Sequence, residues 1–429
     1  MGLPERLAGF ASPRATVAVV ALTYALLTPV SFLNFGRLLP VAVPLLAISI
    51  HLLLRAPKGG RRFIVPTCVL LVLAWFAVSN VWSADVRNSL LDTVLLFVVS
   101  AVALIVASNA SFRDVLVGVV VGGVGLLALS LALAVVAPGM ALEVGYQQGA
   151  LRGITLHRNA LAAALIPPVV AALSLDFPGR RPGLVRAAVL IALIVGILLT
   201  RSSTALAVTV AVLGVALLVA IIRSMPRRYR GIPLAGGAIV GLVIASAVLA
   251  DTGVVLRLLG RESTLTGRVD IWEAVQHLID LRPAIGYGWG GAWGEGSPVR
   301  QQVIYGVGFE LPEAHSGYLD AILQVGYVGA ALLLLTFAVI LVRGVAFLFN
   351  SESRLVIWAP GLIVALLLSD ITESTSVRPP MLFLVMMSVV LLVRVSRGEA
   401  LDGPATAGSS AGPLRVVPPD HVRPRQAHG

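Results

Sequence analysis

The sequence predicts an all-α integral membrane protein, and three observations lead to that prediction. Of the 429 residues, 58% are hydrophobic and only 12% are charged, whereas soluble domains carry roughly 25% charged residues. The mean hydropathy is +0.94. The apolar residues also gather in runs that approach the roughly 20 residues needed to cross a bilayer. Lipid rather than water is therefore expected to be the main solvent of this fold.

About twelve apolar runs of this kind follow one another along the chain. They lie near residues 15–34, 38–54, 64–82, 89–108, 115–137, 159–174, 184–200, 204–222, 232–250, 316–347, 354–371 and 380–395. The run at 316–347 is too long for one straight span. We expect a short helix from Ser316, a break near Gly326, and then the span proper.

The basic residues of the connecting segments predict the orientation, because cytoplasmic loops are enriched in Lys and Arg. These residues cluster on one side, at 55–62, 180–181 and 223–230, and again in the tail, while short loops on the other side hold one or two. An even number of spans then puts both termini in the cytoplasm. The net charge of +11 is accounted for by this bias and by the basic tail, so no nucleic-acid partner is expected.

The chain is expected to fall into five stretches. These are a cytoplasmic N-terminus (1–14), spans one to nine (15–250), an extracytoplasmic loop (251–314), spans ten to twelve (315–395) and a basic cytoplasmic tail (396–429). The loop between spans nine and ten contains an expected amphipathic helix from Val269 to Leu281. The Pro, Gly, Ala and Ser content of the tail predicts disorder.

Basic side chains also gather on the outer side of this topology, against the general bias. They are Arg152, His157, Arg158, Arg201, Arg261, Arg268 and His315. A guanidinium at the outer membrane edge must be solvated, paired or available for an anion, and its planar fork fits phosphate oxygens. Together the arginines favour a diphosphate ligand, although snorkelling toward headgroups is the commoner role for any single one.

His315 lies where the long loop re-enters the membrane. A neutral imidazole there could take a proton from a sugar hydroxyl, and the alternative is a headgroup-facing or structurally hydrogen-bonded histidine. Asp320, one turn into the next helix, would orient the imidazole, bind substrate or simply favour the helix N-terminus. The histidines lack the i, i+4 spacing or the carboxylate partner of zinc sites, so neither a metal nor another cofactor is expected.

Four motifs then appear in a fixed order. They are RGITLHRNALA, LLTRSSTALAV, TGRVDIW with GYGWG in the long loop, and AHSGYLDAILQVGYVG. This order, over roughly residues 150–345, resembles the O-antigen ligase and Wzy-type polymerase superfamily of bacterial membrane glycosyltransferases.

The resemblance implies a GT-C-like fold of twelve transmembrane helices in the bacterial cytoplasmic (inner) membrane. It also implies an extracytoplasmic active site that transfers or polymerises glycan in cell-surface polysaccharide biosynthesis. The donor would be a polyprenyl-diphosphate-linked oligosaccharide, and the hydroxyl attacked would belong to a glycan or glycolipid acceptor. Ligase and polymerase share the donor and differ in the acceptor, so the sequence does not separate them.

The resemblance also implies roles for particular residues. His315 matches the family's base, Arg201 and Arg268 match its diphosphate contacts, and Asp370 is nearest to a recurring acid at the outer end of the penultimate span. The family's common histidine–asparagine pair reads His315–Ser316 here, so a substrate partner is expected to differ.

The remaining candidates are secondary substrate contacts. These are Arg152, His157 and Arg158 for phosphate or glycan, together with Asp320, Asp370, Trp272 and Tyr318. Trp272 and Tyr318 would stack on sugar rings. Packing within the protein or anchoring at the membrane interface is an equal alternative for each.

The alternative from another class is a transporter or flippase of lipid-linked sugars. Such a protein is expected to carry ionisable groups near the bilayer midplane and repeated broken helices. Here the polar residues gather on one face, and no internal repeat is evident. A structural scaffold would not need this set of arginines. The sequence therefore favours the glycosyltransferase.

Overall fold

The computed structural model describes residues 13–28, 39–55, 63–145, 147–250 and 268–399, and the regular elements in these ranges are helices. The long helices are α1 (Pro13–Leu27), α2 (Leu39–Arg55), α3 (Thr67–Val78), α4 (Val86–Asn109), α5 (Phe112–Val136), α7 (Arg158–Ser174), α8 (Pro182–Leu199), α9 (Ser203–Ser224), α10 (Gly231–Ala250), α14 (Gly317–Asn350), α15 (Trp358–Ser369) and α16 (Pro379–Ser396). Shorter helices are α6 (Pro138–Ala141), α12 (Arg268–Leu281) and α13 (Pro298–Val307). A helix thus lies in each predicted apolar run.

Within the described residues, six helices are long and apolar enough to cross a membrane, namely α4, α5, α8, α9, α14 and α16. Four shorter apolar helices cover 13–27, 67–82, 158–174 and 354–369. The prediction of an integral membrane protein is therefore confirmed at this level, and the number of twelve spans stays a prediction. The predicted disordered tail lies almost wholly at 400–429, outside the described residues.

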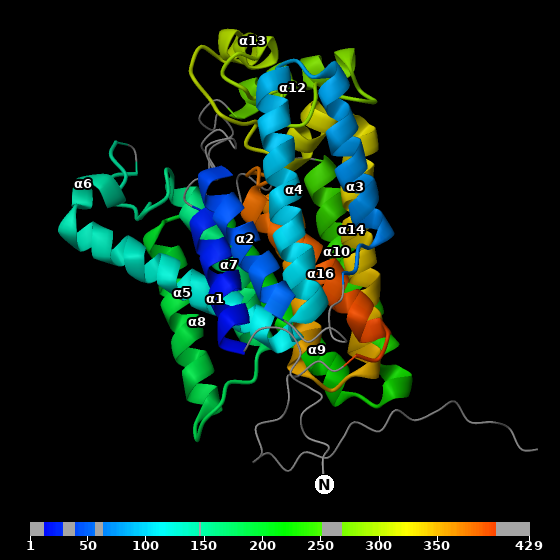
Figure 1. Cartoon of the computed structure of the whole chain (residues 1–429). Coiled ribbons are helices and arrows are strands. Elements are labelled where there is room, and N and C mark those ends of the chain that lie inside the picture. The colour runs from blue at the N-terminus through cyan, green and yellow to red at the C-terminus, as the bar shows by residue number, and fades with distance from the viewer. Residues whose placement is uncertain (1–12, 29–38, 56–62, 146, 251–267, 400–429) are drawn as a thin grey trace, which may run out of the picture.

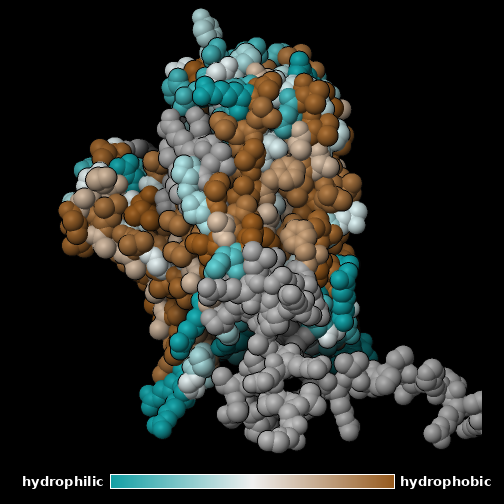
Figure 2. All heavy atoms as spheres, in the orientation of Figure 1, coloured by the Kyte–Doolittle hydropathy of each residue, from teal (hydrophilic) through white to brown (hydrophobic). Residues whose placement is uncertain are grey.

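The long helices pack into one bundle, in which α16 lies against α4 and α1 lies against α5 (Figure 1). Most of α16 is buried, whereas most of α8 is exposed. Hydrophobic residues cover the middle of the molecule and hydrophilic ones gather at its two ends (Figure 2). This distribution is typical of a bundle whose exposed apolar sides face lipid.

A second, smaller apolar cluster covers one end of the bundle. The predicted amphipathic helix is α12, and its residues Ile271, Val275 and Leu278 are all buried as expected. They pack with Val299 and Val303 of α13. The segment after residue 267 is thus a folded unit that sits on the bundle end, because its apolar face has a partner of its own.

The expected break in the tenth apolar run lies at Gly326, whose φ of 68° and ψ of 178° interrupt α14. A break of this kind frees backbone groups that must find other partners. Tyr327 N donates to Pro283 O at 2.8 Å, while Leu323 O accepts from Tyr287 N at 2.9 Å. Trp75 Nε1 donates to Val325 O at 2.9 Å. The kink is therefore held by the loop after α12 and by α3.

Replacing Gly326 by alanine should destabilise the fold. A Cβ there would lie 2.1 Å from Ala284 O, and the positive φ is strained for any L side chain. We expect a loss of about 1–3 kcal/mol in the free energy of unfolding, measured by denaturation in detergent. Gly125→Ala is the matched control, because a Cβ at that position meets nothing within 4 Å. Equal stability of the two variants would contradict this account of the kink.

Candidate active site

Four connecting segments and the start of one helix meet at one end of the bundle. They are the segments before α7, between α8 and α9, before α14, and between α15 and α16, together with the start of α12. Arg158 at the start of α7 donates to Arg201 O at 2.6 Å, and Gly317 N donates to Asp370 O at 2.9 Å. Alternate connections of an up-and-down bundle fall on the same face, which is why residues so far apart in the chain become neighbours.

The carboxylate of Glu373 is the centre of this group. Its Oε1 accepts from Asn159 Nδ2 at 2.7 Å and from Arg268 Nη2 at 2.7 Å, and its Oε2 lies 3.9 Å from His315 Nδ1. Burial acts to raise the pKa of Glu373, but the interactions with His315 and Arg268 outweigh it and lower the pKa to about 2. The carboxylate is therefore ionised at neutral pH. Its pairing contributes stability above its ordinary pKa of 4.5, which is lost as the pH falls toward 2.

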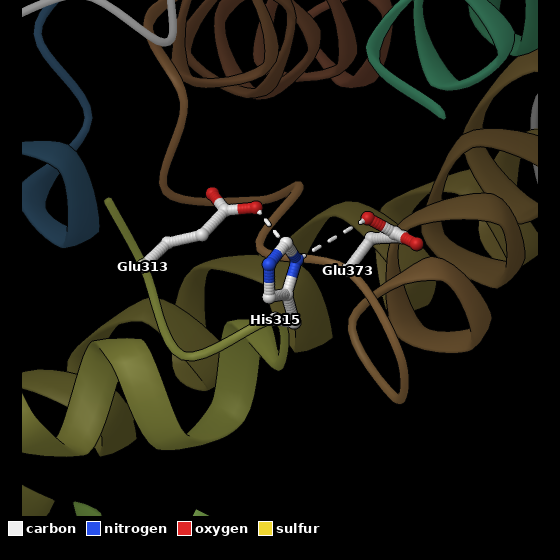
Figure 3. Close-up of side chains that lie close together, drawn as sticks. All are labelled: Glu313, His315 and Glu373. Carbon is white, nitrogen blue, oxygen red and sulfur yellow. Dashed lines mark ion pairs between the residues drawn. The ribbon is translucent and has the colours of Figure 1, made fainter. Parts of the chain in front are cut away.

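His315 lies between two carboxylates that approach the same ring nitrogen (Figure 3). Its Nδ1 is 3.2 Å from Glu313 Oε1 and 3.9 Å from Glu373 Oε2. The expectation that this histidine lacks a carboxylate partner is therefore wrong. Carboxylates at Nδ1 hold a proton on that nitrogen and leave Nε2 to accept one. Because 27% of the side chain is exposed, a ligand can reach the ring.

Glu313 forms an ion pair with Arg378, which precedes α16. The Glu313 side chain is only 3% exposed and the Arg378 side chain is 12% exposed. The pair therefore joins the segment before α14 to the segment before α16. It also supplies the charge balance that a carboxylate with this little exposure requires.

Arg268 is the first residue of α12 and is 6% exposed. One guanidinium nitrogen, Nη2, binds Glu373, while Nη1 is buried without a hydrogen-bond partner among the described residues. An unsatisfied buried donor is costly unless a ligand supplies the acceptor. This nitrogen is therefore available to an anionic oxygen.

Arg201 and His315 are the non-glycine residues with positive φ in the described part of the chain, at 52° and 51°. The Arg201 side chain is exposed and donates to Gln148 O at 3.1 Å. Arg158 Nη1 donates to the carbonyls of both Thr200 and Arg201, at 3.2 and 2.6 Å. Strained backbone of this kind tends to persist where function requires it.

Three of the predicted secondary contacts bind the protein itself. Arg152 donates to Met140 O at 2.9 Å and to Gly139 O at 3.3 Å. His157 caps α7, where its Nδ1 accepts from Asn159 N at 3.2 Å. Arg158 donates to the backbone carbonyls of Thr200 and Arg201. All three side chains therefore bind backbone atoms of the protein, and their role toward a substrate stays a prediction.

The other predicted contacts hold the segment that carries His315. Asp320 Oδ1 accepts from Trp293 Nε1 at 2.7 Å and from Ala314 N at 3.1 Å. Trp272 Nε1 donates to Ala314 O at 3.0 Å. The hydrogen bonds of Asp320 thus fix the backbone next to His315, and the two carboxylates nearest the imidazole are Glu313 and Glu373.

Tyr318 and Asp370 hold the neighbouring connection between α15 and α16. Tyr318 Oη donates to Leu367 O at 2.7 Å. Asp370 Oδ1 accepts from Thr375 N at 3.0 Å and from Ser376 N at 2.9 Å. Asp370 thus shapes the loop, while Glu373 supplies the acid of the cluster. Direct contact of either residue with substrate stays a prediction.

A narrow pocket of about 30 Å³ opens beside the cluster. Its polar wall includes Asn159, Glu313, Glu373 and Arg378, and its apolar wall includes Met381. The pocket therefore lies where charged groups meet an apolar surface of the bundle.

Glu313, Glu373, Asn159 and Arg378 were not singled out as site residues from the sequence. A usable signal was present at 369–378, where SDITESTSVR forms a polar run between two apolar helices on the side of His315. Glu313, two residues before His315, comes directly before the motif AHSGYLDAILQVGYVG. Neither position has a periodic pattern that indicates which of several acids meets the imidazole.

Glu313, His315 and Glu373 could also ligate a metal ion, because one donor atom from each lies within 4.8 Å of the others. Both carboxylates, however, already bind an arginine, Arg378 for Glu313 and Arg268 for Glu373. A divalent cation would have to compete with both guanidinium groups. The present arrangement is therefore better suited to a histidine held by two acids that each pair with an arginine.

Comparison with known proteins relates this region to a family. Residues 188–334 match the O-antigen ligase family, and the matched region contains Arg201, Arg268 and His315. The chain is also 27% identical over 145 residues to the exopolysaccharide production protein ExoQ of Rhizobium meliloti (strain 1021), which covers 32% of this chain and 33% of the relative. The chain thus matches about a third of that protein's length. These matches confirm the resemblance seen in the motifs, because over these residues the chain is similar to the O-antigen ligase family.

Proposed function

We propose that this chain is a glycosyltransferase of the bacterial cytoplasmic membrane that acts in cell-surface polysaccharide biosynthesis. It would transfer or polymerise a glycan from a polyprenyl-diphosphate-linked oligosaccharide onto an acceptor hydroxyl at the extracytoplasmic face. The observation that carries the proposal is the pairing of His315 with two acids beside the buried Arg268, whose Nη1 has no hydrogen-bond partner among the described residues. The family match over 188–334 supports the same class of reaction.

The chemistry follows from these positions. His315 Nε2 takes the proton of the acceptor hydroxyl as its oxygen attacks the anomeric carbon of the donor sugar. The bond from that carbon to the phosphate oxygen breaks, and polyprenyl diphosphate leaves with the electron pair. Arg268 Nη1 and the exposed Arg201 would stabilise the negative charge that grows on the diphosphate. Glu313 and Glu373 stabilise the imidazolium that forms.

The proposed side of the membrane rests on the distribution of charge. The connections rich in arginine, at 180–181 and 223–230, lie at helix ends opposite to those that carry the cluster. Cytoplasmic loops are the ones enriched in such residues. The cluster then faces the extracytoplasmic side, where a donor with its own diphosphate leaving group requires no ATP.

His315→Ala should abolish transfer, with a loss of about 10²–10⁴-fold in kcat, because a general base contributes an effect of that size. The assay uses purified protein in liposomes with a fluorescent polyprenyl-diphosphate oligosaccharide and measures release of polyprenyl diphosphate together with the glycan product. The product also distinguishes a ligase from a polymerase. His277→Ala, at an exposed position of α12, is the matched control. If glycan lipid crosses the bilayer unchanged in both variants, the protein is a transporter.

Arg268→Lys should lower kcat/KM by about tenfold or more, because a single ammonium cannot bind Glu373 and a phosphate oxygen in the geometry of the fork. The effect should appear with the diphosphate donor at saturating acceptor concentration. Arg300→Lys is the control. Arg300 lies on α13 and forms an ion pair with the exposed Glu310. An Arg268→Lys enzyme as active as this control would remove Arg268 from the diphosphate site.

Removal of divalent cations should leave transfer unchanged, because arginines already balance the acids around His315. The measurement is the liposome assay in EDTA, with and without added Mg²⁺ or Mn²⁺. Activity that disappears in EDTA and returns with the cation would mean that Glu313, His315 and Glu373 hold a metal ion.

A further inference from the structure

A second and larger groove opens at the same end of the bundle, apart from the His315 cluster. Its volume is about 390 Å³, and it lies between the turn that follows α3, the C-terminal end of α12 and the start of α13. The side chains that the argument uses are Trp82, Ser83, Arg282, Tyr287 and Gln302. We propose that this groove binds an oligosaccharide chain, several sugars away from the bond that reacts.

Two rings in the groove are held in place before any ligand binds. Trp82 donates its Nε1 hydrogen to Ile285 O at 3.1 Å, and its ring lies 5.6 Å from that of Trp75. Tyr287 donates its hydroxyl to Leu278 O at 3.0 Å, and the Arg282 guanidinium lies over its ring at 5.1 Å. The fixed and partly exposed Trp82 ring loses little conformational entropy on binding and offers a flat apolar face to a sugar ring, while Tyr287, which is only 8% exposed, holds Arg282 in place.

The polar groups of the groove suit neutral hydroxyls. Gln302 is exposed on α13 and offers both donors and an acceptor, while Arg282 and Ser83 add further hydrogen-bonding groups. The described residues that line the groove include no aspartate or glutamate. A combination of the Trp82 face, an amide and a hydroxyl without an acid is expected for a carbohydrate rather than for a cation.

The groove and the His315 cluster lie at opposite ends of α12. Arg268 is the first residue of this helix and Arg282 follows its last, so the two positions are about 20 Å apart along 14 residues. A glycan engaged at the cluster reaches the groove only when it is several sugars long. The identity of the ligand rests on the proposed function, and the groove adds to that function a preference for long chains.

The test uses the full-length protein in lipid nanodiscs. The probes are a disaccharide and an oligosaccharide of about eight sugars, which is longer than the roughly 20 Å of α12. Both are released from the host's own surface polysaccharide, and binding is measured by saturation-transfer NMR and tryptophan fluorescence. Gln302→Ala and Arg282→Gln, both at exposed positions, should weaken binding of the long probe by about tenfold or more and leave the disaccharide unchanged.

Trp82→Phe tests the ring, because it keeps an aromatic face and removes the hydrogen bond to Ile285 O. We expect it to weaken binding of the long probe less than Gln302→Ala does. Tyr305→Ala is the matched control, since Tyr305 lies on α13 with 93% of its surface exposed and does not line the groove. Binding by Tyr305→Ala should equal that of the wild type.

The proposal is overturned if the long probe binds all variants equally, if it does not bind, or if glycerophospholipid headgroups displace it. The last outcome would make Trp82 a membrane anchor. The His315→Ala variant separates this proposal from the proposed function. This variant should lose transfer and keep full binding of the long probe. If the proposed function alone is wrong, the wild type will bind the long probe but will not transfer glycan.

Discussion

A buried negative charge at Glu373 is the constraint on which the end of the bundle that carries His315 depends. An ionised carboxylate away from water must be paired, and here the partners come from different elements, Asn159 of α7 and Arg268 of α12. The backbone carbonyl of the same residue accepts from Gly317 N at 3.1 Å. One residue therefore ties together the three segments that present His315 and the guanidinium group of Arg268.

The surroundings of His315 are built to hold a conformation that an isolated chain would avoid. Positive φ at a non-glycine residue costs on the order of 1–3 kcal/mol, and the neighbouring structure must supply it. Both backbone polar groups of Ala314, the residue before His315, are hydrogen-bonded. Its N–H donates to Asp320, and its carbonyl accepts from Trp272. Asp320 and Trp272 thus position the backbone next to His315. Arg158 plays the same part for Arg201, whose φ is also positive, because it donates a hydrogen bond to the Arg201 carbonyl.

The sequence predicts those features that depend on a local pattern. Apolar runs locate each long helix, a 3.6-residue period locates α12, and Gly326 marks the break in α14 because a tight change of direction requires glycine. His315 is found from its position at a membrane re-entry. The pairing of Glu373 with His315 is not predictable in this way, because it depends on how α15 and α16 pack against α14. For the same reason the backbone contacts of Arg152 and Arg158 appear only in three dimensions.

The position of the charges relative to the bundle favours transfer over translocation. A carrier of lipid-linked sugars needs a polar path through the middle of the membrane. Here the centre of the bundle is filled by α16, where Leu382, Phe383 and Val390 are buried among apolar neighbours. The cluster around Glu373 and the aromatic groove are both confined to one end, joined by the length of α12. A site that is closed below by apolar packing and open above can let a polar head and a growing chain meet at the surface, which is what a membrane glycosyltransferase requires.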